Sequence, residues 1–185
     1  MFHQPPTLHR LFFALLPPPV LARQVAAAAG WFDADGRALP AERLHVALFV
    51  LDDLPDRPRG LVAALQAIGR SVDCGPVAVT LDRASGSRRS VALRPAHRHP
   101  DLHRLQGDLA DAARARRIAM REGYEFAPHM TLGYREGEPF NQPVRPVGWL
   151  ADELVLIDSH PGRTRHEVLG RWPLVARADA QLTLL

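Results

Sequence analysis

The chain has 185 residues, of which 46% are hydrophobic and 23% are charged, and this globular composition excludes an intrinsically disordered chain. A single cysteine, Cys74, excludes an internal disulfide framework, and no apolar run approaches the roughly 20 residues of a membrane-spanning helix. The formal net charge of +3 is too small to identify a nucleic-acid-binding protein, although all 23 basic residues are arginines, which suit an anionic partner. We therefore expect a cytoplasmic protein without membrane contact.

Short apolar runs predict strands, and apolar side chains at helical spacing predict helices. In chain order the predicted elements are a strand at 11–16, a helix at 21–32, a strand at 44–51, a helix at 61–72, strands at 77–81 and 90–93, a helix at 102–112, and strands at 129–134, 154–157 and 167–169. Turn sequences at Ser85-Gly86-Ser87 and Pro161-Gly162 predict hairpins. The mixture predicts an α+β class, and no linker divides residues 1–185, so we expect one domain made of two pseudo-symmetric lobes.

Two of the predicted strands begin at a histidine, one in each half of the chain, at His45 and at His129. Successive side chains point to opposite faces of a strand, so every second residue shares a face with the histidine. The side chains that this alternation places on the two histidine faces are His45, Ala47, Phe49, His129, Thr131, Gly133 and Arg135. If the two strands lie side by side, the two imidazoles meet across one cleft.

Two imidazoles that titrate near neutral pH can cleave a phosphodiester by acid–base catalysis. The neutral histidine takes a proton from water, and the charged one gives a proton to the departing oxygen. On the same faces, Thr131 can donate a hydrogen bond to phosphate and Phe49 can stack on a base. The alternative from residue pattern alone is that His45 and His129 are half-buried strand histidines bonded to backbone.

Five stretches of the sequence, in order and nearly end to end, resemble the 2H phosphoesterase superfamily, and within it the bacterial RNA 2′,3′-cyclic phosphodiesterases, also called 2′-5′ RNA ligases. The stretches are residues 10–15, 44–51, 126–132, 154–159 and 167–174. The resemblance implies a bilobal α+β fold, with two antiparallel-rich sheets and flanking helices around a central cleft. It also implies that His45 and His129 are the acid–base pair and that Thr131 binds phosphate.

The sequence departs from the family pattern at two positions. Ala47 stands where the first His-x-Thr/Ser motif has a hydroxyl, and the loss of one hydrogen bond to a charged group costs roughly 1.5–3 kcal/mol. Tyr134 stands where many relatives have arginine, and strand parity places the next residue, Arg135, on the His129 side. We therefore expect Arg135 to bind phosphate in place of that arginine.

Other histidines receive no catalytic role from the sequence. His99 and His103 have the i, i+4 spacing of a helical metal pair, but Pro100 disfavours helical geometry at His99 and no further ligand pattern completes a site. His160 and His166 flank the predicted closing turn, and we assign them no chemistry. The sequence thus predicts neither a metal site nor a cofactor.

From these observations we expect a monomeric, metal-independent enzyme that hydrolyses a nucleoside or RNA 2′,3′-cyclic phosphate to a 2′-phosphomonoester. His129 is assigned as the general base and His45 as the general acid, and the expected partners are RNA ends or cyclic nucleotides. Two alternatives stay open. The chain can be a nucleotide- or RNA-end-binding module whose turnover Ala47 has weakened, or it can carry a 2′-5′ RNA ligase-type activity.

Overall fold

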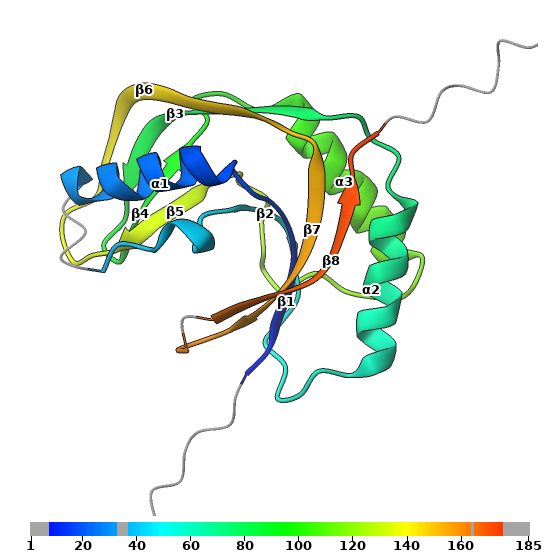
Figure 1. Cartoon of the computed structure of the whole chain (residues 1–185). Coiled ribbons are helices and arrows are strands. Elements are labelled where there is room, and N and C mark those ends of the chain that lie inside the picture. The colour runs from blue at the N-terminus through cyan, green and yellow to red at the C-terminus, as the bar shows by residue number, and fades with distance from the viewer. Residues whose placement is uncertain (1–7, 33–36, 164, 176–185) are drawn as a thin grey trace, which may run out of the picture.

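A computed structural model describes residues 8–32, 37–163 and 165–175, which form two four-stranded antiparallel sheets with helices packed beside them (Figure 1). The first sheet has the strand order β2-β1-β7-β8, with β1 at Arg10–Leu15, β2 at Val46–Val50, β7 at Glu153–His160 and β8 at Arg165–Pro173. The second sheet has the order β5-β4-β3-β6, with β3 at Val77–Gly86, β4 at Ser90–Arg94, β5 at Met130–Tyr134 and β6 at Phe140–Ala151. The predicted α+β class is confirmed.

Within the part of the chain that the structure describes, three α-helices and two short 3-10 turns lie between these strands. They are α1 at Pro19–Ala28, η1 at Ala29–Phe32, η2 at Ala41–Arg43, α2 at Arg59–Ser71 and α3 at Pro100–Arg114. Proline stands in the first turn of α1 and of α3, where its missing N–H costs nothing. The helices α2 and α3 pack against each other, α2 against β7 and β8 and α3 against β2 and β3, so both cover one face of the first sheet. In the described ranges, none of the helices is long and apolar enough for a membrane crossing.

The first sheet is apolar on both faces, and the two faces belong to different clusters. Alternate residues of β1, such as Leu11 and Phe13, are buried in the main core that the helices cover. Phe12 and Ala14 project to the other side, where they form a smaller cluster with three more buried residues. We call this second side the histidine face, because the Phe12 ring lies 4.8 Å from the ring of His45.

Both histidine strands contain a β-bulge, at the same distance from the histidine. In β2, Ala47 pairs with Ala14 and Phe49 with Phe13, so Leu48 is an extra residue without a partner on β1. In β5, Thr131 pairs with Ala92 and Gly133 with Val91, so Leu132 is the extra residue. A bulge reverses the inward and outward alternation of all residues that follow it.

The strand β6 was not predicted from the sequence. It contains Pro143 and Pro146, and proline weakens a strand prediction because it cannot donate to a hydrogen-bond ladder. In the structure β6 lies at the edge of the second sheet, next to β3, and a register irregularity opposite Asp82 separates its two paired stretches. An edge strand tolerates prolines because one of its sides has no partner strand.

Candidate acid–base site on two histidine strands

His45 lies directly before β2, and its ring is held by a backbone carbonyl. The Nδ1 atom of His45 is 2.7 Å from the carbonyl oxygen of Arg43. Because a carbonyl only accepts, Nδ1 carries the proton and Nε2 keeps its lone pair. Burial of the ring lowers the pKa of His45 from its ordinary 6.5 to about 4; the carbonyl of Arg43 opposes this shift, and the charges of His129 and Arg43 add to it.

His129 is held in the same way directly before β5. Its Nδ1 donates to the carbonyl oxygen of Ala127 at 2.8 Å, again two residues earlier in the chain. This leaves Nε2 as the free nitrogen in the neutral ring. Burial lowers the pKa of His129, the carbonyl opposes the shift, and the charge of Arg94 adds to it. Both histidines therefore share one tautomer, fixed by one local backbone geometry.

The two histidine strands lie near each other, although they belong to different sheets. Residues of β2 and β5 are in contact, and the charge of a protonated His129 is close enough to lower the pKa of His45. The segment before β2 also reaches the second sheet, since the Leu39 N–H donates to the Leu132 carbonyl at 2.7 Å. Two neighbouring imidazoles with free Nε2 atoms are the arrangement that two-histidine acid–base chemistry needs.

A third imidazole, that of His166 on β8, stands beside His45. The ring centroids of these two histidines are 5.4 Å apart, and each ring also contacts Phe12. Burial lowers the pKa of His166 to about 4, and the charges of His45, Arg43 and His160 act in the same direction. Sequence reasoning left His166 without a role, because only the packing of β8 into the first sheet brings it to His45.

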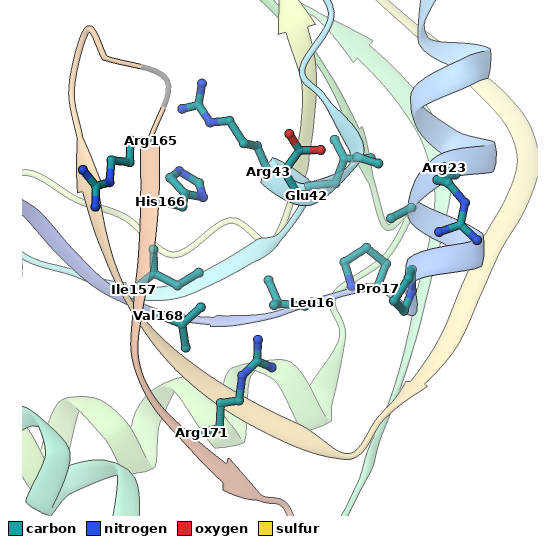
Figure 2. Close-up of a pocket in the computed structure, with 14 residues that line it drawn as sticks. Leu16, Pro17, Arg23, Glu42, Arg43, Ile157, Arg165, His166, Val168 and Arg171 are labelled. Atoms are coloured by element: carbon teal, nitrogen blue, oxygen red, sulfur yellow. The ribbon is translucent and has the colours of Figure 1, made fainter.

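A cavity of about 670 Å³ is lined by His166, the ring neighbour of His45, but by neither His45 nor His129. Figure 2 shows its walls, with His166 on one side and the segment that carries Glu42 and Arg43 on the other. The cationic side chains that line it are Arg23, Arg43, Arg165 and Arg171. Four guanidinium groups and one carboxylate give the lining of this cavity a net positive charge, which suits a phosphate-bearing ligand.

The first motif presents a methyl group where the second presents a hydroxyl. Ala47 is half-buried and packs against the cluster of the histidine face that includes Phe12 and Val50. Thr131 is half-buried on β5, opposite Ala92. Only the second motif therefore has a side-chain donor two residues after its histidine.

The predicted role of Phe49 is wrong. Its side chain is only 1% exposed and belongs to the main core, so it has no free ring face for a base. The bulge at Leu48 is the physical reason, because it turns Phe49 away from the side of His45 and turns Val50 toward it.

The predicted placement of Arg135 is also wrong. The bulge at Leu132 reverses the parity of β5, so Tyr134 is 49% exposed whereas Arg135 is 7% exposed. The Arg135 NH1 atom donates to the carbonyls of Glu138 and Ser87, at 2.9 and 3.3 Å, and its guanidinium carbon lies 5.3 Å from the centre of the Phe140 ring. Arg135 is thus a structural residue that fixes the end of β5.

Several solved structures resemble this chain. E. coli LigT complexed with 3′-AMP superimposes with a TM-score of 0.75 at 26% identity, over 90% of this chain and 98% of that one. A crystal structure described only as a phosphoesterase gives 0.72 at 26% identity, over 90% and 98%. The protein TT0787 of Thermus thermophilus shares the fold, with a TM-score of 0.68 at 22% identity over 91% and 100%.

Other crystals of E. coli LigT hold ATP or NADP+, at TM-scores of 0.72 and 0.71. No curated protein sequence matches the chain. The model of the 2′-5′ RNA ligase superfamily matches residues 17–163, a span that includes both histidine strands and β7. The resemblance seen in the sequence is confirmed, and the chain belongs to the 2′-5′ RNA ligase superfamily, with the fold of the 2H phosphoesterases.

Proposed function

We propose that this protein hydrolyses the 2′,3′-cyclic phosphate of a nucleoside or an RNA end to a 2′-phosphomonoester, with His45 and His129 as its acid–base pair. The observation that carries the proposal is that the two neighbouring imidazole rings have the same tautomer and the same backbone hydrogen bond. Each Nδ1 is bound to the carbonyl two residues earlier, which leaves each Nε2 free, and the charge of His129 is close enough to lower the pKa of His45.

The reaction divides its proton transfers between the two rings. One neutral Nε2 takes a proton from water as the water oxygen attacks phosphorus, and the bond from phosphorus to the 3′ oxygen breaks. The other histidine, protonated, gives its proton to that leaving oxygen, so the product is a 2′-phosphate with a free 3′ hydroxyl. Both transfers use imidazole nitrogens, so the proposed reaction is independent of metal ions.

The surroundings of the rings favour His45 as the base and His129 as the acid, the reverse of the assignment that we made from the sequence. A histidine whose pKa is about 4 is neutral at pH 7 and ready to accept a proton. Burial lowers the pKa of His129 as well, but a phosphate anion bound beside the ring raises it again, which supports protonation there.

The proposed phosphate contact is the hydroxyl of Thr131, two residues after His129. After the bulge of β5, the exposed side chain of Tyr134 replaces Arg135 as the residue that projects from the end of this strand. The structures of E. coli LigT complexed with 3′-AMP, ATP and NADP+ support a nucleotide as a ligand of this chain.

The test is hydrolysis of a nucleoside 2′,3′-cyclic phosphate in excess chelator, with the product position identified by phosphorus NMR. His45→Ala and His129→Ala are each expected to lose about 10²–10⁴-fold in kcat/KM. His97→Ala, a change at an exposed histidine, is the control and keeps full activity. Turnover that survives in both site variants would rule the proposal out.

The packed methyl of Ala47 favours one alternative, a nucleotide-binding module with little turnover. Affinity for a 2′-phosphonucleotide without hydrolysis of the cyclic substrate would support the module. Restored hydrolysis in Ala47→Thr would then identify the missing hydroxyl as the cause. Incubation with RNA fragments that carry 2′,3′-cyclic and 5′-hydroxyl ends separates hydrolysis from 2′-5′ ligation.

A further inference from the structure

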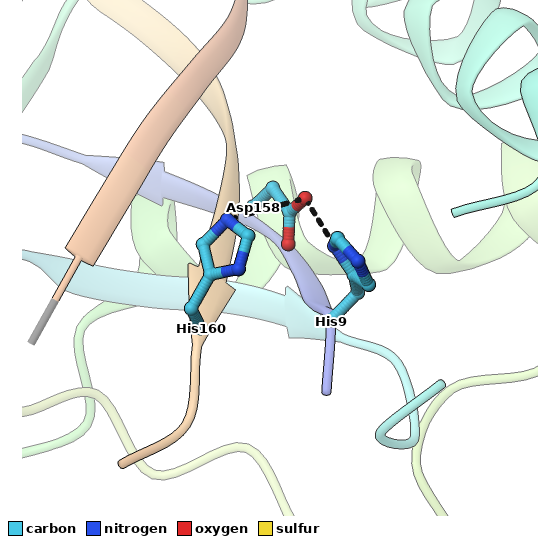
Figure 3. Close-up of side chains that lie close together, drawn as sticks. All are labelled: His9, Asp158 and His160. Atoms are coloured by element: carbon cyan, nitrogen blue, oxygen red, sulfur yellow. Dashed lines mark hydrogen bonds and ion pairs between the residues drawn. The ribbon is translucent and has the colours of Figure 1, made fainter. Parts of the chain in front are cut away.

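A second group of histidines lies on the first sheet, at the face opposite to the histidine face. His9 directly precedes β1, His160 is the last residue of β7, and Asp158 lies two residues before it. Asp158 pairs with Leu11, a residue of the main core, so its side chain points to the core side of the sheet. Figure 3 shows the three side chains converging at this end of β1 and β7.

The ligand atoms of these three residues gather around the Asp158 carboxylate. His9 Nδ1 is 2.7 Å and His160 Nε2 is 3.9 Å from Asp158 Oδ2, and one ligand atom from each residue lies within 4.8 Å of those of the other two. The rings of His9 and His160 meet edge to face, with their centroids 4.9 Å apart. Among the residues that the structure describes, this is the group with donor atoms spaced for a metal ion.

The group also contains buried polar atoms that lack a hydrogen bond. Asp158 is fully buried, yet within the described ranges its Oδ1 atom has no hydrogen-bond partner. The same holds for Nε2 of His160, whose side chain is 11% exposed. A buried carboxylate oxygen and a buried imidazole nitrogen left without partners are costly. A cation bound to Asp158 and to His160 Nε2 would give the imidazole nitrogen a partner and would neutralise the buried carboxylate.

We propose that His9, Asp158 and His160 bind a divalent transition-metal ion of the zinc type. Two imidazoles and a carboxylate are ligands that zinc accepts, at bond lengths of about 2.0–2.2 Å and therefore ligand separations of about 3.4 Å. The present separations bracket that value, so His9 moves slightly away from Asp158 while His160 moves toward it.

Arg57 is the competing cation at this site. Its NH1 atom lies 3.3 Å from Asp158 Oδ2 and 3.0 Å from Glu167 Oε2, just before α2. Glu167 pairs with Asp158 across β7 and β8, so Arg57 can release Asp158 to the metal and keep its ion pair with Glu167. The bound ion would tie the start of β1 to the end of β7, away from the proposed acid–base pair.

The experiment uses the full chain, freed of metal with a chelator and titrated with Zn²⁺ by calorimetry, with Co²⁺ absorption as a report of tetrahedral coordination. We expect one equivalent to bind and the Tm to rise, since a ligand of the folded state stabilises it. His9→Gln and His160→Gln are each expected to weaken binding about 100-fold or more. His97→Gln, at an exposed histidine, is the matched control and binds as the unchanged protein does.

Arg57→Gln provides the opposite test, because removal of a positive charge beside Asp158 is expected to strengthen binding at least about fivefold. Circular dichroism verifies that each variant is folded. Absence of binding at Zn²⁺ concentrations up to about 10⁻⁴ M, far above the dissociation constants of structural zinc sites, would overturn the proposal. So would affinity unchanged in His160→Gln or in Arg57→Gln. Hydrolysis of the cyclic phosphate is measured separately and does not depend on this outcome.

Discussion

The strand that follows His45 and the strand that follows His129 share a backbone plan. In both, the histidine precedes the strand by one residue, its Nδ1 donates to the carbonyl two residues earlier, and a bulge lies three residues later. These features come from main-chain geometry, so they tolerate wide differences in side chains. The repeated plan accounts for how two distant segments present equivalent imidazoles.

The side chains around the two histidines differ. His45 is packed among Phe12 and His166 and has the pKa of about 4, and its strand carries Ala47. His129 has Thr131 on its strand and an exposed Tyr134 at the end. The backbone thus places the two rings in equivalent settings, whereas different side chains pack around them. This difference in surroundings is the basis on which we assign His45 as the base in the proposed reaction.

The largest expected effect separates the two histidines by pH. Loss of either imidazole is expected to lower kcat/KM by about 10²–10⁴-fold. In the unchanged protein, kcat/KM rises with pH as His45 loses its proton near pH 4 and falls as His129 loses its own below pH 6.5. In the pH profile of the residual activity, His45→Ala should remove the decrease on the acid side, and His129→Ala should remove the decrease on the alkaline side. The opposite result would reverse our assignment of base and acid.

Replacement of Phe49 tests whether its side chain lies in the main core or on the histidine face of the first sheet. Phe49→Ala is expected to lower the free energy of unfolding by about 3–5 kcal/mol, because the residue is fully buried. Phe49→Leu, which keeps most of the volume, should leave the KM for a cyclic nucleotide unchanged. Urea denaturation measures the first effect and steady-state kinetics the second. A KM raised by Phe49→Leu would restore the stacking role that the structure argues against.

The low pKa of His45 predicts that the protein loses stability in acid. The folded state holds the proton less tightly than the unfolded chain does, so stability falls as pH drops from 6.5 toward 4. Protonation of His45 can lower the free energy of unfolding by at most on the order of 3 kcal/mol. Urea titrations at pH 7 and 4.5 should show that the free energy of unfolding decreases less in His45→Asn than in the unchanged protein. The asparagine retains a donor toward the Arg43 carbonyl. An equal loss in both proteins would contradict the pKa shift.

The smallest expected effect concerns the hydroxyl that one strand has and the other lacks. Thr131→Ala is expected to reduce kcat by about 10–150-fold, the value of one hydrogen bond to a charged group, and Thr131→Ser should restore it. Ala47→Thr should raise kcat within the same range. If Ala47→Thr has no effect while Thr131→Ala does, the first strand does not contact the phosphate.

Local patterns predicted the described α-helices and all described strands except β6, whereas contacts between strands caused the errors about which face a side chain takes. The apolar runs located β1, β2 and β7, and the hairpin of β7 and β8 across Pro161-Gly162 is confirmed. Alternation failed for Phe49 and Arg135, because a bulge depends on the partner strand and has no mark in its own sequence.

The positions of His166 beside His45 and of His9 beside Asp158 were also beyond prediction from the sequence. Each pair is separated by more than a hundred residues along the chain, and only the strand order of the first sheet brings its members together. The family resemblance identified the acid–base pair, but it gave no information on these neighbours.

The prolines of β6 have a consequence for how copies of this chain meet. An unpaired strand edge is a template on which another molecule can add a strand and begin to aggregate. Proline has no N–H group, so Pro143 and Pro146 each remove one backbone donor from this edge strand. The two prolines that weakened the prediction of β6 therefore also disfavour pairing of this edge with a strand of another molecule.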